Sequence, residues 1–294
     1  MGDIFQPGKH LTLRNGNTYQ IYGMLGMGLH SKVYTARDNK TNQTLALKVI
    51  DLNHKNMYVK ASTISRRQSF QNELRYLLRL QKTNPYIVRV FDYDIRNTGI
   101  IAMEQGLPLR QYLPKTNVPS GPLLHPSTVH QMWYQLVDGI RLLHQSRIVH
   151  SDLKPENIIV LSNGQTKIID LGVSFTLPRM VSAKRRIWAG TPDYSSPEMH
   201  RIPKGVVPKF GYKSDIWSLG IILYEMAAGY RPLYGLSTNY EKINYLRHLK
   251  HDLPIDQNLE KGVYNALTQC LRVDPKHRPT AEQLFVHPYV VNGY

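Results

Sequence analysis

The sequence is poor in cysteine, in acidic residues and in long apolar runs. Cys270 is the only cysteine among 294 residues, which excludes an internal disulfide and a cysteine-based zinc site. The longest apolar runs, such as 221–223 and 226–228, are far shorter than the roughly 20 residues that span a bilayer. The first residues also lack an apolar stretch behind a basic start, so we expect no secretory signal. These absences predict an intracellular protein without a membrane partner.

The shortage of acidic residues leaves the chain strongly basic. There are 37 Lys and Arg against 21 Asp and Glu, a net charge of +16. Three segments hold basic residues and no acidic ones: 52–72, 171–192 and 199–214. Two interpretations stay open, a solvated surface or a field that attracts acidic protein substrates and phosphate groups. Nucleic acid ranks third, because no docking motif accompanies the charge.

Apolar periodicity predicts an α+β fold in two lobes. Residues 19–103 alternate short apolar runs with turn residues and contain one helical pattern between Phe70 and Leu78, which indicates a strand-rich small lobe with one helix. No repeat or low-complexity linker interrupts the chain, so we expect one continuous domain. After Gly106 the apolar spacing becomes helical over four segments, 128–144, 214–228, 240–251 and 260–271.

A hairpin is predicted around Asn163-Gly164, which two short apolar runs flank. If the turn centres on this pair, Asn157 faces Asp170 across the ladder. Two oxygen side chains that can bind a metal ion would then meet at the open end of the hairpin. The alternative is that both merely cap strand ends, and Asp152 five positions before Asn157 argues against it.

Gly26 and Gly28 indicate a phosphate-binding loop in the small lobe. Glycines let backbone N–H groups close over anionic oxygens, although Ser31 stands where a third glycine is expected. A flexible turn between strands is the alternative for the loop alone. Lys48 follows on a predicted strand, where its ammonium can pair with α- and β-phosphate oxygens. An isolated strand lysine is usually a solvated edge residue, and its place after the glycine loop favours the phosphate role.

A lysine that binds phosphates needs an acidic partner, and Glu73 on the predicted helix is the candidate. The alternative is a solvated glutamate on the helix surface. The polar stretch 53–68 separates the two residues in sequence, and we expect it to form an extended loop before the helix.

Asp152, Lys154, Asn157 and Asp170 predict phosphoryl transfer in the second lobe. Asp152 is the proposed base that orients a substrate hydroxyl and accepts its proton, and Lys154 would neutralise charge on the transferred group. Asn157 and Asp170 offer oxygen ligands to Mg²⁺, which borrows its other ligands from water and from the nucleotide. The sequence therefore predicts ATP and Mg²⁺ as cofactors.

Residues 170–198 have little periodicity and are predicted to form a mobile activation segment. Phosphorylation beside a basic cluster can order such a segment through charge-assisted hydrogen bonds. The alternative is that the hydroxyls are ordinary loop residues. The candidate sites are Ser174, Thr176, Ser182 and Thr191.

Together these motifs resemble the eukaryotic protein kinase family over almost the whole chain. The resemblance implies the bilobal kinase fold and a division into five parts: an N-terminal extension 1–18, an N-lobe 19–103, a hinge 104–107, a C-lobe 108–290 that completes the kinase domain 19–290, and a tail 291–294.

The resemblance also implies roles for further residues. Met103 corresponds to the gatekeeper, Glu104 to Gly106 to the hinge that meets adenine, and Gly190-Thr191-Pro192 to the wall on which substrate lies. Three groups are implied besides: ATP contacts at Leu25, Gly26, Gly28, Val33, Ala46, Lys48, Met103, Glu104, Gly106 and Ile159; a hydrophobic spine of Leu77, Val90, His150 and Leu171; and structural residues, namely Glu198 paired with Arg278, and Asp215 as anchor of the catalytic loop.

Within the family the chain is similar to the monopolar spindle (TTK-like) dual-specificity kinases, which implies Ser/Thr transfer to acidic, kinetochore-associated proteins in the nucleus or cytoplasm. Tyrosine transfer, another Ser/Thr subfamily and a catalytically silent scaffold stay open, and nothing indicates an obligate oligomer. Ser151 replaces the usual arginine before Asp152, and Leu171 replaces phenylalanine after Asp170. The residues that carry this similarity are Tyr19, His30 to Val33, Asn72 to Leu74, Phe91 to Asp94, Met103 to Gly106, His150 to Asp152 and His287 to Tyr289.

Overall fold

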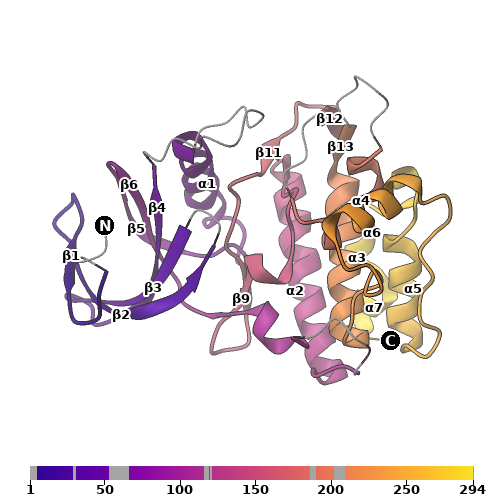
Figure 1. The fold of residues 1–294 in the computed structure, drawn as a ribbon, viewed down its shortest axis with the longest axis horizontal. Coiled ribbons are helices and arrows are strands. Elements are labelled where there is room, and N and C mark those ends of the chain that lie inside the picture. Colours follow the sequence, from indigo (N-terminus) through magenta and orange to yellow (C-terminus); the bar gives the residue numbers. More distant parts are fainter. Residues whose placement is uncertain are drawn as a thin grey trace. The chain divides into compact units, whose positions relative to one another are not determined.

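The chain forms two compact units, one up to Gly106 and the other from Leu107 (Figure 1). The structure is a computed structural model. It describes residues 5–28, 31–52, 66–115, 119, 121–185, 190–201 and 209–293, apart from the side chains of 184 and 185. None of the described helices combines the length and apolar character needed to cross a membrane.

The first unit is an antiparallel sheet with one helix, as the periodicity predicts. The six strands run in the order β1-β2-β3-β4-β6-β5. Their bounds are β1 His10–Thr12, β2 Thr18–Met27, β3 Ser31–Asp38, β4 Thr44–Asp51, β5 Val90–Ile95 and β6 Thr98–Met103, and the helix α1 spans Arg66–Leu80.

Helix α1 contacts the sheet through the apolar stripe that the sequence predicts. Phe70, Leu74 and Leu77 are buried on one face, as expected for residues three and four positions apart. The ring of Phe70 packs on Gly99 of β6, where an added Cβ atom would lie 2.7 Å from the ring. The glycine is therefore required by close approach of helix and strand.

The two edges of the sheet are joined by polar side chains. The β1–β2 turn and the start of β2 bring Asn15, Asn17 and Tyr19 to Asp92 on β5, each donating a hydrogen bond of 2.8 Å to its carboxylate. Burial alone would raise the pKa of Asp92, but these hydrogen bonds outweigh burial and lower it. The sheet is thus curled, and β1, which lies in the predicted N-terminal extension, is one of its strands.

The second unit is mainly helical, as predicted. Its helices are α2 Pro126–Gln145, α3 Tyr212–Ala228, α4 Asn239–His248, α5 Lys261–Cys270, α6 Ala281–Phe285 and α7 Pro288–Asn292. Short 3-10 turns are η1 Leu109–Tyr112, η2 Pro155–Asn157, η3 Pro192–Tyr194, η4 Pro197–Met199 and η5 Pro275–His277. The short strands are β7 Leu107–Pro108, β8 Ile148–Val149, β9 Ile158–Val160, β10 Thr166–Ile168, β11 Phe175–Thr176, β12 Ala183–Arg185 and β13 Lys209–Gly211.

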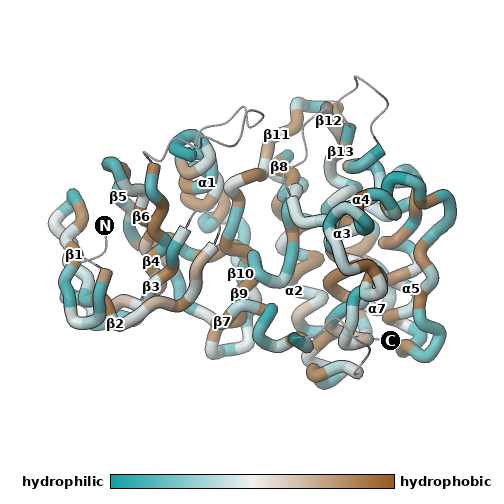
Figure 2. Tube along the Cα trace, viewed as in Figure 1, coloured by the Kyte–Doolittle hydropathy of each residue, from teal (hydrophilic) through white to brown (hydrophobic). Residues whose placement is uncertain are grey.

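Helix α3 is the centre of the second unit and is buried around almost its whole circumference. Figure 2 shows apolar residues along strands of the first unit and along helices of the second. An added Cβ atom at Gly220 of α3 would lie 2.8 Å from Cys270 on α5, so the glycine allows the two helices to pack closely. The four predicted long helices are all present, although α4 ends at His248 rather than at His251, because Leu249 is extended.

Candidate active site

Lys48 and Glu73 form a buried ion pair within the first unit. Lys48 Nζ lies 2.6 Å from Glu73 Oε1, and both side chains are almost inaccessible. Lys48 lies on β4 between Val33 and Ile101 of the neighbouring strands, and Glu73 lies on the buried face of α1. The pair of Lys48 with Glu73 is therefore present, and the acid lies on the helix, as expected.

The two glycines of the predicted phosphate loop lie at the end of the β2–β3 hairpin. Gly26 pairs with Val33, and open space surrounds its missing Cβ. The N–H of Gly28 donates to the carbonyl of Ser31, 2.8 Å away. A bulge at Leu25 shifts the register just before Gly26, and Leu25 is exposed. His30 lies outside the described residues.

The predicted gatekeeper Met103 is the last residue of β6, and the predicted hinge follows it. Met103 is buried and pairs with Ala46 on β4 and Val90 on β5. Glu104 is held at both backbone and side chain, because its N–H donates to the Arg89 carbonyl at 3.0 Å and its Oε2 accepts from the Arg89 N–H at 2.8 Å. Gly106 closes the first unit, and Ile159 lies on β9 in the second.

The predicted hairpin is present, but its predicted register is wrong by one residue. Ile158 pairs with Ile168, and the N–H of Ile169 donates to the carbonyl of Asn157 at 3.0 Å. Asn157 therefore faces Ile169 rather than Asp170. The reason is the length of the loop, which has three residues, 162–164, instead of the expected two. Its last residue is Gly164, whose φ is 80°.

Asp152 is the hub of the predicted catalytic loop. Its Oδ1 accepts the N–H of Thr191 at 3.0 Å, and its Oδ2 lies 2.8 Å from Lys154 Nζ. Lys154 also donates to Thr191 Oγ1 at 2.7 Å. Asn157 Nδ2 donates to the carbonyl of Asp152 at 2.8 Å. These contacts join two segments that lie nearly forty residues apart in sequence.

Asp215, at the start of α3, holds the backbone before Asp152. Its carboxylate accepts the N–H groups of His150 and Ser151 at 2.8 and 2.9 Å and contacts His144 Nε2 at 2.8 Å. Ser151 has φ of 74°, a left-handed conformation that these hydrogen bonds stabilise. Burial lowers the pKa of His150, which accepts the N–H of Asp152 at its Nδ1.

Glu198 and Arg278 make the bidentate contact that the resemblance implies. Two guanidinium nitrogens donate to the two carboxylate oxygens at 2.7 and 2.9 Å, and the Arg278 side chain is fully buried. The guanidinium also lies over the ring of Trp217 on α3.

The four candidate phosphosites differ in accessibility. Thr176 and Ser182 are exposed, whereas Ser174 is buried and donates to the carbonyl of His150 at 3.1 Å. Thr191 is half-buried and carries the contacts to Asp152 and Lys154 described above. Thr176 and Ser182 therefore suit modification better than the other two.

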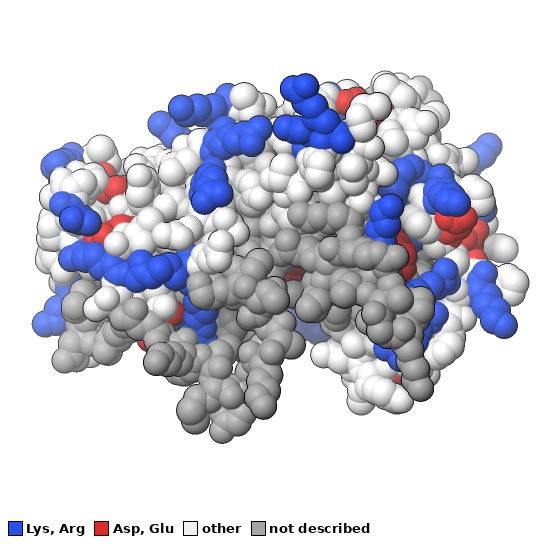
Figure 3. All heavy atoms as spheres, turned by 90° about the horizontal axis from the view of Figure 1, so that it is seen from above, with Lys and Arg blue, Asp and Glu red and all other residues white. Residues whose placement is uncertain are grey.

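The basic surface is described only in part. Arg179, Arg201 and Lys209 are exposed, and Figure 3 shows many Lys and Arg and few Asp and Glu side chains on one face. Several other basic side chains of the predicted segments lie outside the described part of the chain, namely Lys55, Lys60, Lys184, Arg185, Arg186 and Lys204.

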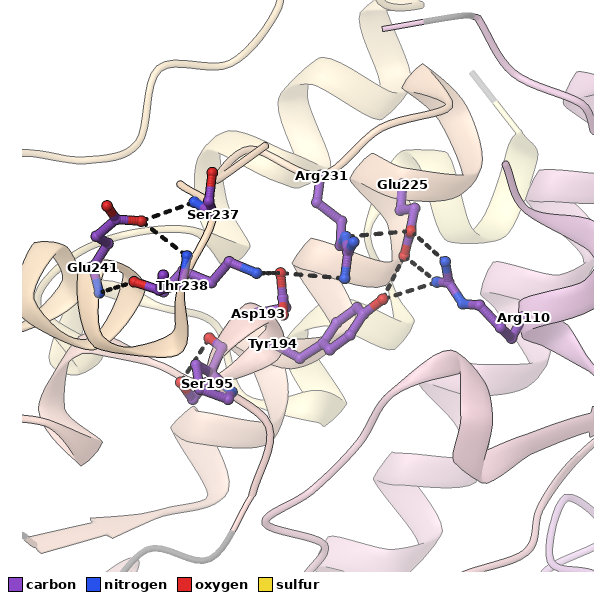
Figure 4. A network of polar contacts seen from close by, with 11 residues as sticks. Arg110, Asp193, Tyr194, Ser195, Glu225, Arg231, Ser237, Thr238 and Glu241 are labelled. Atoms are coloured by element: carbon purple, nitrogen blue, oxygen red, sulfur yellow. Dashed lines mark hydrogen bonds and ion pairs between the residues drawn. The ribbon is translucent and has the colours of Figure 1, made fainter. Parts of the chain in front are cut away.

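A polar network near Thr191 was not predicted from the sequence. Arg110 in η1 donates to both carboxylate oxygens of Glu225 on α3, at 2.8 and 2.7 Å, and to Tyr194 at 2.9 Å (Figure 4). Tyr194 donates to Glu225 at 2.6 Å, and Arg110 Nε lies 3.2 Å from Glu156. No local pattern could identify these partners, since they are far apart in sequence.

A second part of this network holds the residue before Tyr194. Asp193 accepts from Lys242 on α4 at 2.8 Å and pairs with Arg231 at 3.2 Å. The acidic side chains of residues 193 and 225 are thus both paired with cations, of which Lys242 is buried and the two arginines are half-buried.

The oxygen ligands available for a metal ion fit Mg²⁺. Because Asn157 Nδ2 is bound to a carbonyl, its Oδ1 is oriented as a free acceptor, and Asp170 adds a carboxylate whose Oδ1 accepts the N–H of Gly172 at 2.9 Å. In the described ranges no three His, Cys, Asp or Glu side chains come together as a complete metal cage. A small oxygen donor set is what Mg²⁺ uses when phosphates and waters complete its shell.

Comparison with known proteins identifies relatives along nearly the whole chain. The family model described as the protein kinase domain matches residues 19–290. The chain is 31% identical over 285 residues to the dual specificity protein kinase TTK of Mus musculus, covering 94% of this chain and 32% of the relative. It is 28% identical over 299 residues to the probable serine/threonine-protein kinase mps1 of Dictyostelium discoideum, covering 98% of this chain and 29% of the relative.

Aurora kinase of Candida glabrata is 27% identical over 277 residues, covering 94% of this chain and 71% of the relative. The chain therefore spans about a third of the length of the TTK and mps1 relatives and most of the Aurora relative. Because the family model covers both units, this chain belongs to the protein kinase family and has its bilobal α+β fold.

Proposed function

We propose that the chain transfers the γ-phosphoryl group of ATP to Ser or Thr hydroxyls of proteins, with Asp152 as the base. The observation that supports this most is the contact of Asp152 and Lys154 with Thr191, which holds a carboxylate and an ammonium side by side. Asp152 orients the attacking hydroxyl and accepts its proton as the new oxygen–phosphorus bond forms and the bond to ADP breaks.

Lys154 and Lys48 provide positive charge for the transfer. Lys154 Nζ, 2.8 Å from Asp152, neutralises charge that develops on the phosphoryl oxygens. Lys48 binds the α- and β-phosphates, and Glu73 fixes its side chain through the 2.6 Å contact. We propose that the other residues in contact with the nucleotide are those that the resemblance implies: Leu25, Gly26, Gly28, Val33, Ala46, Met103, Glu104, Gly106 and Ile159.

Asn157 and Asp170 would hold Mg²⁺, which shields the phosphate charges when it is bound. Their neighbours keep both ligands oriented, Asn157 through the Asp152 carbonyl and Asp170 through the N–H of Gly172. We expect transfer to require Mg²⁺ and to cease when a chelator removes it.

The test is Mg²⁺-dependent transfer of phosphate from ATP to casein. We expect Asp152→Asn to lower kcat by at least about a hundredfold, the contribution of a general base. Asp138→Asn is the matched control, because Asp138 pairs with Arg141 on α2 and takes no part in the proposed mechanism. Equal turnover by the wild type and Asp152→Asn would favour a silent kinase-fold scaffold instead.

We further propose a kinase of the spindle-checkpoint type that acts on acidic, kinetochore-associated proteins in the nucleus. The support is the similarity to the TTK and mps1 relatives, together with the basic surface. Another Ser/Thr subfamily is the alternative, since an Aurora kinase matches at 27% identity. A peptide library with Ser, Thr and Tyr acceptors tests both: preference for acidic flanks supports the proposal, and preference for basic flanks contradicts it.

A further inference from the structure

Directly after Thr191, the turn contains a buried serine–histidine contact that the proposed mechanism does not use. Ser195 Oγ lies 2.5 Å from His200 Nε2 and 2.9 Å from the carbonyl oxygen of Pro192. Ser195 and His200 are only 4% and 3% exposed. Figure 4 shows Ser195 beside the Asp193–Tyr194 network. Two buried polar side chains, one directly after η3 and one directly after η4, thus contact each other rather than solvent.

The direction of these hydrogen bonds follows from the available protons. A serine hydroxyl has one proton, and a carbonyl oxygen can only accept. Both contacts are made together when Ser195 donates to Pro192 and the Nε2–H of His200 donates to Ser195. Burial and the nearby Arg247 lower the pKa of His200 to about 4, so the ring is neutral at physiological pH. The two hydrogen bonds therefore run in one direction, from the His200 ring to the Ser195 hydroxyl and from this hydroxyl to the Pro192 carbonyl.

These hydrogen bonds end next to the contacts of Thr191 with the proposed catalytic residues. Pro192 follows Thr191, which is hydrogen-bonded to both Asp152 and Lys154. The Pro192 carbonyl accepts from the Ser195 N–H at 3.2 Å as well as from its hydroxyl, so the turn η3 is closed twice. His200 is itself held, because its carbonyl accepts from Arg247 Nε of α4 at 3.2 Å.

We propose that His200 is a positioning residue of the substrate-binding segment 191–195. Acting through Ser195, it fixes the turn that places Thr191 against Asp152. A segment that is no longer held in place must be ordered when the protein substrate binds, and this cost weakens substrate binding and leaves the ATP site unchanged. The inference rests on the proposed function and adds to it a residue outside the catalytic loop.

The Ser195–His200 contact does not have the geometry of a nucleophilic serine and its base. A serine that attacks a substrate donates its proton to the histidine and must reach the substrate. Ser195 is buried and donates to a carbonyl oxygen, so its proton points away from the ring. The geometry favours positioning over covalent chemistry.

The test compares His200→Leu with His200→Gln, since glutamine can place an N–H near the position of Nε2. With casein and ATP, we expect His200→Leu to raise the KM for casein about tenfold, the effect of losing one hydrogen bond to a buried group. The KM for ATP should not change, and His200→Gln should restore most of the loss. Ser195→Ala should have the same effect as His200→Leu, and the double variant should add little.

Three results would overturn the inference: wild-type kinetics in His200→Leu, no recovery in His200→Gln, or a lower kcat with unchanged KM for casein, which partial unfolding would produce. If the wild-type chain transfers no phosphate, the proposed function fails, and amide exchange of Tyr194 and Ser195 then decides the inference separately. Their exchange should be faster in His200→Leu than in His200→Gln, and equal rates would contradict the positioning role.

Discussion

Lys48 and Glu73 are buried charges that are stable only as a pair. Removing one partner leaves the other uncompensated, which costs about 3 kcal/mol. We predict that Lys48→Ala abolishes phosphoryl transfer and lowers the free energy of unfolding by about this amount, while thermal unfolding stays cooperative. Transfer assays and calorimetry measure the two effects.

The matched control for Lys48→Ala is the double variant with Glu73→Gln. It should recover part of the stability, because no carboxylate is left buried, and it should recover no transfer. Loss of cooperative unfolding in Lys48→Ala would indicate that Lys48 is mainly structural.

The lowered pKa of His200 also leads to a prediction of how the stability of the protein depends on pH. Its folded-state pKa of about 4 lies below the ordinary value of 6.5, so the unfolded state binds more protons between these values. The contribution of the neutral His200 ring to the free energy of unfolding is therefore present above about pH 6.5 and is lost as the pH falls toward about 4. A shift of this size corresponds to about 3 kcal/mol.

Chemical denaturation at several pH values measures this contribution as the difference between the wild type and His200→Gln. That difference should change by about 3 kcal/mol between pH 6.5 and about 4. A difference that is constant over this range would contradict the prediction. The comparison removes the effect of His150 and His287, whose pKa values burial also lowers.

Among the elements, the β9–β10 hairpin depends on the left-handed residue at its turn. Gly164 has φ of 80°, and an added Cβ atom would meet no other atom, so only backbone strain opposes a side chain there. We predict that Gly164→Ala lowers the free energy of unfolding by about 1 kcal/mol. Gly235→Ala is the matched control, since Gly235 has open space and no positive φ, and it should have almost no effect. Equal effects would indicate that strain at Gly164 is unimportant.

The same hairpin shows where prediction from sequence stops. Asn163-Gly164 identifies the turn, but the dipeptide is compatible with loops of two or three residues, and only the folded backbone decides between them. The long helices were predicted because their apolar periodicity extends over many residues. The end of α4 was not, since a helix end depends on a few weak local preferences.

The candidate site was predictable where its spacing is local. Asp152, Lys154 and Asn157 lie within six consecutive residues, so their types and intervals are visible in the sequence. The partners Arg110 and Glu225 are far apart, and so are His200 and Arg247, so tertiary packing selects them. Sequence patterns carry no such information.

For the whole molecule, the net charge of +16 should influence association with acidic substrates. We predict that the KM for casein rises as ionic strength increases toward about 0.15 M, because salt screens attraction over a Debye length of about 8 Å. The KM for an uncharged peptide is the control and should stay constant. Equal salt dependence of both would assign the effect to the enzyme rather than to substrate charge.

The same titration tests the nucleic-acid alternative. Binding of duplex DNA that persists at about 0.15 M salt would favour it, since non-specific phosphate contacts weaken steeply with salt. Negligible binding there would leave protein substrates as the partners of the basic surface.

The close packing of α3 on α5 around Gly220 has a practical consequence. Cys270 is fully buried there, and burial raises its pKa to about 12, so its thiol does not react at neutral pH. Cysteines introduced at exposed positions, such as Lys40 in the first unit and Val286 in the second, are then the only reactive thiols of the chain. A donor and an acceptor dye on this pair would test, by energy transfer, whether the separation of the units changes when ATP is added.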